Sequence, residues 1–242
     1  MIRVILWDID GTILNFLEAE RFGIRKGFAR FGLGECTDEM LADYSRINRC
    51  HWEMLERGEI TKPEALEGRF REFFSKYGVR TDIIGEFNRG YQNDLGETVC
   101  FNDEAPDVIR SLQPFVRQYG VTNGTKIAQT KKIVKSGLDR LLDGVFISED
   151  VGAEKPSRDF FEGVWSKIGR FSPDEVLIVG DSLTSDIRGG NNVGIRTCWY
   201  NPKHAENDKG AHVDYEIADL REVPEIVIKL HQTERRTNSC AF

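Results

Sequence analysis

Two aspartates separated by a single residue are the first side chains along the chain whose types and spacing could do chemistry. Asp8 and Asp10 follow the apolar residues 4–7, which have the composition of a buried strand. Carboxylates this close at the end of a buried segment repel each other and resist the loss of water. A divalent cation would make the arrangement tolerable, although Asp10-Gly11 taken alone is also an ordinary turn sequence.

Polar residues also follow three other apolar runs of the chain. Residues 122–124 (TNG) end the second run, Lys155 lies in the loop after the third, and the fourth leads into Asp181 and Asp186 within GDSLTSD. Each feature alone has an ordinary interpretation as a turn, a solvated loop or an acidic helix N-cap. Their co-occurrence at strand ends instead predicts one site that combines several acids, a hydroxyl group and a lysine.

The elements that must position these side chains alternate along the chain. Apolar, β-rich runs are separated by helical patterns, which is typical of a parallel sheet covered on both faces. The predicted fold class is α/β, with a Rossmann-like, doubly wound parallel sheet whose ligands bind beyond the carboxyl ends of the strands. The predicted strands lie at residues 4–7, 119–122, 145–148, 176–181, 195–200 and 215–217.

One connecting helix is predicted directly after residues 122–124. Ile127, Thr130, Ile133 and Val134 share one helical face, and Gly137 is placed to cap the helix at its end. This shared face is therefore the apolar side of the predicted helix.

Residues 15–97 interrupt the alternation because they contain no convincing strand. Four amphipathic helical patterns follow one another there, and the third begins with Thr61 and Glu64 at capping-box spacing. We therefore predict two domains. The α/β core comprises residues 1–14 and 98–242, and an all-helical domain of residues 15–97 is inserted into it.

Composition and charge exclude several classes of protein. The 242-residue chain has a formal net charge of −7 and a sequence pI near 5.3, which argues against binding a nucleic-acid polymer or an anionic membrane. Five scattered cysteines form no metal-binding pair and are expected to be reduced thiols. No apolar run approaches the roughly 20 residues of a membrane span. We predict a cytoplasmic protein that is a monomer or a homodimer.

The strand-end motifs, taken with the helical insert, resemble the haloacid dehalogenase (HAD) superfamily of phosphotransferases, and they occur in that family's order. DIDGT is similar to its first motif, TNG to its second, KP to its third and GDSLTSD to its fourth. The helical insert resembles the family's C1-type cap. A closer resemblance to the pyrimidine-type 5′-nucleotidase branch lies in VTNGT, ISEDVGAEKPSRDFF and GDSLTSDIRGGNNVGIRTCWYNP, and it covers the core better than the cap.

This resemblance implies catalytic and metal-binding roles for four acids. Asp8 would be the nucleophile that forms an aspartyl-phosphate, and Asp10 would be the general acid and then the general base. The implied cofactor is Mg²⁺, which prefers oxygen ligands and keeps some of its water. Its ligands would be Asp8, the backbone carbonyl of Asp10, Asp181, and Asp186, the last either directly or through water.

The resemblance also implies a binding site for the transferring phosphoryl group. The Thr122 hydroxyl and the backbone amide of Asn123 would donate hydrogen bonds to its oxygens, and Lys155 would neutralise the charge that builds there. Gly11 would let the backbone pass close to the phosphate.

The implied function is a Mg²⁺-dependent phosphomonoester hydrolase for a small phosphorylated metabolite, with a nucleoside 5′-monophosphate as the leading candidate. Specificity is expected to lie in the cap and in Leu14, Asn15 and Phe16. A phosphatase for a sugar phosphate or phosphoglycolate would use identical core chemistry and stays an alternative. A 2-haloacid dehalogenase is disfavoured because family members with that activity lack an acid at the position of Asp10. A non-catalytic phosphate-sensing module is disfavoured because every catalytic position is filled.

Overall fold

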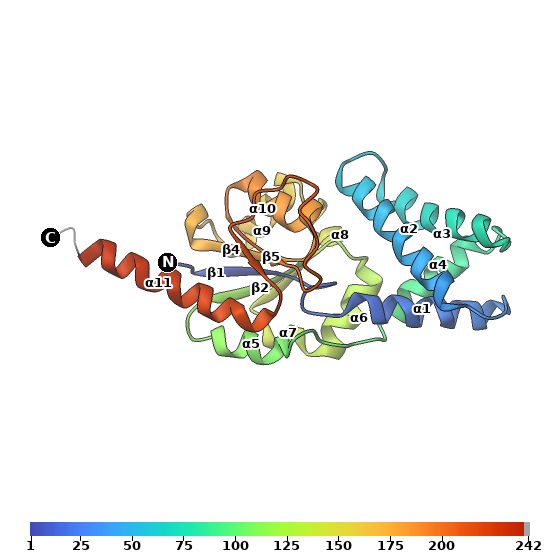
Figure 1. The fold of residues 1–242 in the computed structure, drawn as a ribbon, viewed down its shortest axis with the longest axis horizontal. Coiled ribbons are helices and arrows are strands. Elements are labelled where there is room, and N and C mark those ends of the chain that lie inside the picture. The colour runs from blue at the N-terminus through green and yellow to red at the C-terminus, as the bar shows by residue number, and fades with distance from the viewer. Residues whose placement is uncertain (240–242) are drawn as a thin grey trace. The chain divides into compact units, whose positions relative to one another are not determined.

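The computed structural model describes the backbone of residues 1–239 and the side chains of residues 1–232, and the chain divides into two compact units (Figure 1). The first, which we call the α/β unit, comprises Met1–Leu14, Phe101–Gly124 and Gly137–Phe242. The second, the helical unit, comprises Asn15–Cys100 and Thr125–Ser136. The helical unit therefore includes the helix that follows residues 122–124, in addition to the inserted segment.

The α/β unit is built on a six-stranded parallel sheet with the strand order β3-β2-β1-β4-β5-β6. The order runs outward from β1 in both directions, so the predicted doubly wound sheet is confirmed. Every residue of β1 and β4 is buried, which explains why both read as unbroken apolar runs. The strands are β1 (Val4–Asp8), β2 (Arg117–Thr122), β3 (Gly144–Ile147), β4 (Val176–Gly180), β5 (Arg196–Tyr200) and β6 (Tyr215–Ile217).

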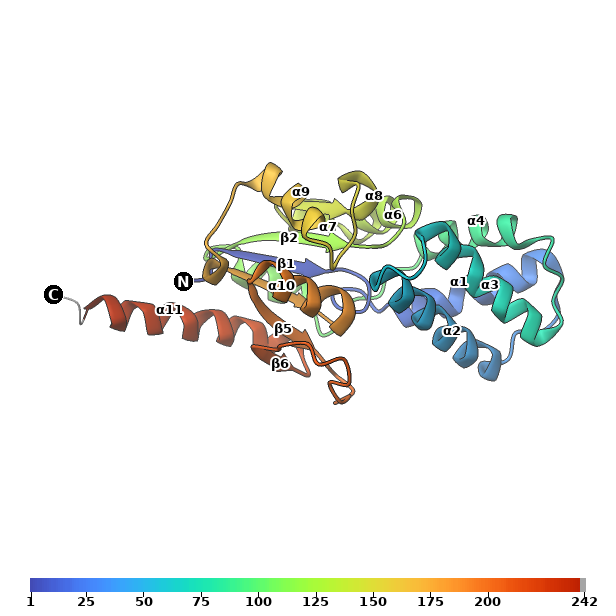
Figure 2. The same ribbon diagram turned by 90° about the horizontal axis from the view of Figure 1, so that it is seen from above.

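Helices cover both faces of this sheet. Figure 1 shows α9 (Arg158–Ile168) and α10 (Arg188–Val193) on one face, with α5 (Ala105–Leu112) and α11 (Val223–Ser239) on the other, and Figure 2 looks onto the sheet and shows its strands side by side. Phe160 and Phe161 of α9 are fully buried against Leu6 and Ile178 of the sheet. The shorter helices are α7 (Leu138–Leu141) and α8 (Ser148–Val151), and single helical turns lie at Pro173–Glu175, Leu183–Ile187 and Leu220–Glu222.

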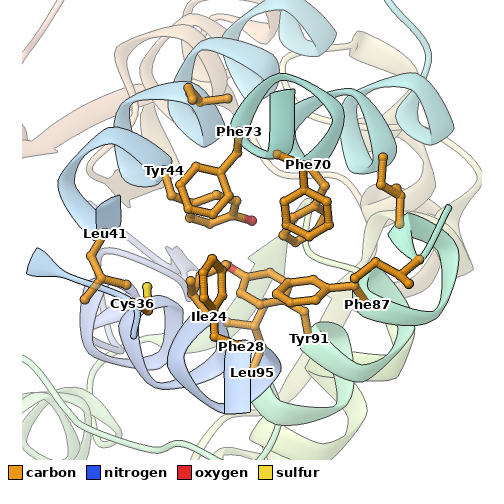
Figure 3. Close-up of a cluster of buried hydrophobic side chains, with 14 of the residues drawn as sticks. Ile24, Phe28, Cys36, Leu41, Tyr44, Phe70, Phe73, Phe87, Tyr91 and Leu95 are labelled. Carbon is orange, nitrogen blue, oxygen red and sulfur yellow. The ribbon is translucent and has the colours of Figure 1, made fainter. Parts of the chain in front are cut away.

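The inserted segment forms four helices around an aromatic core. They are α1 (Phe16–Phe31), α2 (Asp38–Glu56), α3 (Lys62–Tyr77) and α4 (Ile84–Leu95). The predicted capping box opens α3, because the Thr61 hydroxyl accepts from the Glu64 amide while the Glu64 carboxylate accepts from the Thr61 amide. Figure 3 shows Tyr44, Phe70 and Phe87 among the aromatic side chains that fill the space between these helices.

The apolar face predicted for α6 (Lys126–Ser136) is wrong in three of its four positions. Ile127 and Val134 are 50% and 58% exposed, Thr130 is also exposed, and only Ile133 is buried. The buried face instead carries Ala128, Gln129, Lys132 and Ile133. The reason is that α6 packs against α4 and Phe16 of the helical unit, where the Lys132 ammonium lies 5.2 Å from the centre of the Phe16 ring.

Two predictions from composition can be compared with the structure. Cys36, Cys50, Cys100 and Cys198 form no disulfide within the described residues, whereas Cys240 lies outside those residues. Among the described residues, no helix combines the length and apolar character that crossing a bilayer requires.

Candidate active site

The strand order brings the predicted site residues to one edge of the sheet. β1 lies between β2 and β4, and its last residue is Asp8. Thr122 is the last residue of β2, and Asp181 directly follows β4. The parallel register pairs Asp8 with Val121, so these residues occupy the same level at the carboxyl ends of neighbouring strands.

Lys155 is a buried lysine that forms ion pairs with both Asp8 and Asp186. Its side chain is only 1% exposed, and its ammonium group donates to Asp8 Oδ1 at 2.8 Å, to Asp186 Oδ1 at 2.6 Å and to the Val121 carbonyl at 3.0 Å. Because an ammonium group has three protons, these contacts use its full donor capacity. Burial alone would lower the pKa of Lys155, but the charges of Asp186 and Asp8 raise it above its ordinary value.

Three carboxylates form a compact cluster beside this lysine. Single oxygens of Asp8, Asp181 and Asp186 all lie within 4.8 Å of one another. Asp8 and Asp186 are buried, whereas Asp181 is exposed. Asp8 Oδ2 is itself buried and has no hydrogen-bond partner among the described residues. A buried carboxylate oxygen without a donor, next to two more carboxylates, fits a hard divalent cation.

Raised pKa values at two of these acids indicate that the cluster lacks positive charge. Burial, followed by the negative charge of Asp186, raises the pKa of Asp8 well above its ordinary value, and Lys155 opposes this only in part. Asp181 reaches solvent, yet the protein around its carboxyl group still removes water and raises its pKa to about 7, with Asp186 adding to the effect. Three carboxylates and one ammonium group leave two net negative charges when all are ionised, which a divalent cation would balance.

Gly11 lies where the backbone must approach an acid of this cluster. It has a φ of +101°, and a Cβ atom built at this position would come within 2.5–2.7 Å of the Asp181 carboxyl group. Any side chain there would therefore strain the backbone and displace Asp181. Only a steric restriction applies at Gly180, where a Cβ atom would collide with the Asp186 carboxyl group.

Asp10, Thr122 and Asn123 also lie at this edge of the sheet, outside the three-acid cluster. The Asp10 carboxylate is not part of the three-acid cluster found among the described residues, and the Asp10 backbone forms a bridge with Leu14. The Thr122 hydroxyl is buried and accepts from the Gly124 amide at 3.0 Å. Asn123 holds the lysine loop, because its side chain donates to the Lys155 carbonyl at 2.8 Å and accepts from the Lys155 amide at 2.9 Å.

Sequence reasoning did not identify two residues that support the site. The Trp199 indole donates to the Asp181 carbonyl at 2.9 Å, and the Asn102 side chain donates to the carbonyls of Gly11 and Thr12 at 3.3 and 2.9 Å. Trp199 was recognised only as part of a strand. Asn102 carries no signal in a single sequence, because its partners are backbone groups about 90 residues away along the chain.

The turn that begins at Asn102 is strained. The next two residues, Asp103 and Glu104, have φ values of +42° and +56°, which are unusual for residues other than glycine. Asp103 is held there by hydrogen bonds from the Tyr200 hydroxyl at 2.6 Å and the Leu220 amide at 3.2 Å. These contacts fix the segment that supports the loop after Asp8.

Comparisons with known proteins identify the family of the chain. The family described as haloacid dehalogenase-like hydrolase matches residues 5–200. The HAD-hydrolase YfnB of Bacillus subtilis is 37% identical over 225 residues, which cover 93% of this chain and 95% of YfnB. A crystal structure of YfnB bound to magnesium resembles this one with a TM-score of 0.88, covering 93% of this chain and 98% of that one.

Two further relatives carry names that state an activity. The pyrimidine 5′-nucleotidase PynA of Streptococcus pneumoniae is 34% identical, covering 91% of this chain and 93% of PynA. The glyceraldehyde 3-phosphate phosphatase of Pyrococcus furiosus is 34% identical and covers 98% of both chains. The chain therefore belongs to the haloacid dehalogenase-like hydrolases, as its motifs predict. Its similarity to the pyrimidine 5′-nucleotidase branch is likewise confirmed.

Proposed function

We propose that this hydrolase is a Mg²⁺-dependent phosphomonoesterase that acts through an aspartyl-phosphate on nucleoside 5′-monophosphates. The observation that carries the proposal is the environment of Asp8. One of its oxygens is held by Lys155 at 2.8 Å, and the other is buried beside two more acids with no donor from the residues that the structure describes. Such a carboxylate has one oxygen fixed in place and one available to a cation or to phosphorus.

The donor set supports magnesium as the cation. Asp8, Asp181 and Asp186 would hold it, together with the backbone carbonyl of Asp10, because Mg²⁺ selects hard oxygen ligands. When bound, the ion would neutralise the cluster and the substrate phosphate, as metal ions do in phosphoryl transfer. It would also favour the ionised form of Asp8, which burial opposes.

Phosphoryl transfer then needs two proton movements, both assigned to Asp10. An oxygen of Asp8 forms a bond to phosphorus as the ester P–O bond breaks, and the departing alkoxide takes the proton of Asp10. In the second half, Asp10 removes a proton from water as that water attacks phosphorus. The bond between phosphorus and Asp8 breaks, which releases inorganic phosphate and restores both acids.

The remaining predicted residues would stabilise the phosphoryl oxygens, Lys155 through its charge and the other two through hydrogen bonds. Lys155 contributes its fixed positive charge beside Asp8, and Thr122 and the Asn123 amide lie at the end of the neighbouring strand. Removing one donor of this kind typically slows catalysis about 100- to 1,000-fold. Because the side chain of Asn123 hydrogen-bonds to the backbone of Lys155, its proposed second function is to hold the lysine in place.

We propose that the inserted residues 15–97 serve as a C1-type cap that selects the leaving group. The name of PynA supports a pyrimidine nucleotide as substrate, whereas that of the Pyrococcus relative supports a sugar phosphate as the alternative. Dehalogenation is disfavoured because Asp10 is present. A cytoplasmic location and a monomeric or homodimeric state stay predictions.

A metal-supplemented screen of phosphomonoesters tests this function. With Mg²⁺, the wild-type protein should hydrolyse cytidine and uridine 5′-monophosphates faster than ribose 5-phosphate, glyceraldehyde 3-phosphate or phosphoglycolate. EDTA should stop the reaction and excess Mg²⁺ restore it. Asp8→Asn should abolish turnover, while Asp159→Asn, a matched change at an exposed position of α9, should not.

Two results would contradict the proposal at different levels. Turnover by Asp8→Asn at the wild-type rate would show that Asp8 is not the nucleophile. A wild-type preference for sugar phosphates over nucleotides would leave the mechanism intact but refute the proposed substrate class.

A further inference from the structure

The α/β unit has a second concavity at the opposite ends of the same strands. A cavity of about 500 Å³ lies between the segment before β1, the turn before β2 and the turn before β3. Arg3 at this end of β1 and Asp8 at the other are five residues apart, which corresponds to about 16 Å of extended chain. We call this cavity the basic pocket, and its charged and aromatic lining residues are Arg3, Phe115, Arg117, Arg140, Asp143 and Phe171.

The lining of the basic pocket carries an excess of positive charge in a chain whose net charge is −7. Three arginines face a single acid, Asp143, and one oxygen of this acid already accepts from the Gln118 amide at 2.7 Å. Within the described part of the chain, the ion-pair partner of Arg140 is Asp139, at the long distance of 3.9 Å, and the Arg140 side chain is 76% exposed. Positive charge therefore remains available to a ligand.

Two of these arginines are held against one aromatic ring. The guanidinium groups of Arg3 and Arg117 lie 5.4 and 4.9 Å from the centre of the Phe171 ring. Arg3 also pairs with Glu175 at 3.2 Å, but no carboxylate pairs with Arg117 in the part of the chain that the structure describes. Like charges gathered around a neutral ring are stabilised by an anion between them, and planar guanidinium groups match phosphate oxygens in pairs.

The rim of the basic pocket adds an aromatic surface. Phe115 is 60% exposed, which is unusual for so large an apolar side chain, and it lies two residues from Arg117. A planar ring can stack on such a side chain while its phosphate reaches the arginines. The cavity volume also falls within the range of about 300–1,000 Å³ that is common for small-molecule sites.

We propose that the basic pocket is a second, non-catalytic binding site for a nucleoside monophosphate. Arg117 and Arg140 bind its phosphate group, and Phe115 contacts its base. The site is separate from the acid cluster, and no residue of the basic pocket has a part in the proposed phosphoryl transfer.

Equilibrium dialysis with labelled cytidine 5′-monophosphate and Mg²⁺ measures the occupancy of this site. The background is Asp8→Asn, which would prevent hydrolysis during the measurement. We expect two equivalents to bind, one at each site. Adding Arg117→Gln and Arg140→Gln should weaken the affinity for one of the two bound nucleotides by about tenfold or more, because charge-assisted hydrogen bonds to phosphate are lost. Arg158→Gln, at an exposed position of α9, is the matched control and should keep both equivalents.

Competing ligands separate the contributions of phosphate and base. Ribose 5-phosphate should compete at the basic pocket less well than the nucleotide, and cytidine should not compete. Unchanged binding in the Arg117→Gln, Arg140→Gln protein would overturn the proposal, and equal competition by ribose 5-phosphate would overturn the assignment of Phe115. In the presence of Asp8, the two arginine substitutions should leave hydrolysis unchanged, which also shows that the protein is folded. The change in binding depends only on the arginines, so this test can fail or succeed whether or not the acid cluster hydrolyses nucleotides.

Discussion

Lys155→Met is the substitution that most directly probes the charge balance of the candidate active site. Methionine has a similar length and no charge, so it fills the same buried space without a large cavity. The change removes hydrogen bonds from Asp8, Asp186 and the Val121 carbonyl in one step. It leaves neighbouring carboxylates without their buried counter-charge.

The expected loss of stability follows from these contacts. Removing one partner of a buried ion pair typically costs about 3–5 kcal/mol, since the remaining charge stays desolvated. For a domain of roughly 150–250 residues, each kcal/mol lowers Tm by about 2–4 °C. The α/β unit should therefore melt about 6–20 °C lower in metal-free buffer. Protonation of Asp8 absorbs part of the cost at low pH, so the loss should be smaller at pH 5 than at pH 8.

Thermal unfolding with and without Mg²⁺ measures both the loss and its cause. Magnesium should raise Tm more in Lys155→Met than in the wild type, because the cation then supplies the only positive charge in the cluster. Lys167→Met, at an exposed position of α9, is the matched control and should change Tm very little. A metal-free Tm within about 2 °C of the wild type would show that Lys155 does not compensate the buried acids, and the proposed charge balance would be refuted.

Three smaller perturbations test other parts of the structure. Glu20 is 2% exposed, and burial raises its pKa. The folded state therefore favours the protonated carboxyl group. The stability that this proton contributes is lost as pH rises from the unfolded-state pKa of about 4 through the folded-state pKa. The change in urea midpoint caused by Glu20→Gln should therefore be more favourable at pH 8 than at pH 5, and an equal effect at both would contradict this pKa. Asn102→Leu should lower the free energy of unfolding by about 1–3 kcal/mol and also reduce kcat, because two loop carbonyls lose their donor; denaturant unfolding and steady-state kinetics check both effects. Trp199→Phe should weaken Mg²⁺ binding about 10-fold or more, as outer-shell substitutions do, and a calorimetric Mg²⁺ titration showing wild-type affinity would refute the role of its hydrogen bond to Asp181.

The grouping of the acids at one edge of the sheet could be predicted from the sequence for a physical reason. Parallel strands place their carboxyl ends together, so acids that follow separate apolar runs must converge once those runs are recognised as strands. Asp8 and Asp181 are about 170 residues apart in the chain, yet β1 and β4 are neighbours in the sheet. Strand periodicity does not determine which backbone groups a distant side chain will contact. That is why Asn102 and Trp199 became visible only in three dimensions.

Helical periodicity did not predict the buried face of α6, because that prediction holds only where the partner surface is apolar. The surface that α6 meets includes Phe16, whose aromatic ring accepts a lysine ammonium group as well as an apolar side chain. Thr125, directly before α6, also donates to Gln92 of α4 at 2.7 Å and accepts from the Ala128 amide at 3.4 Å. These contacts fix the start of the helix and the direction of its faces, so that Ile127 points outward despite its apolar character. An amphipathic pattern therefore predicts that a helix forms, whereas the residues it buries depend on polar and aromatic groups of its partner.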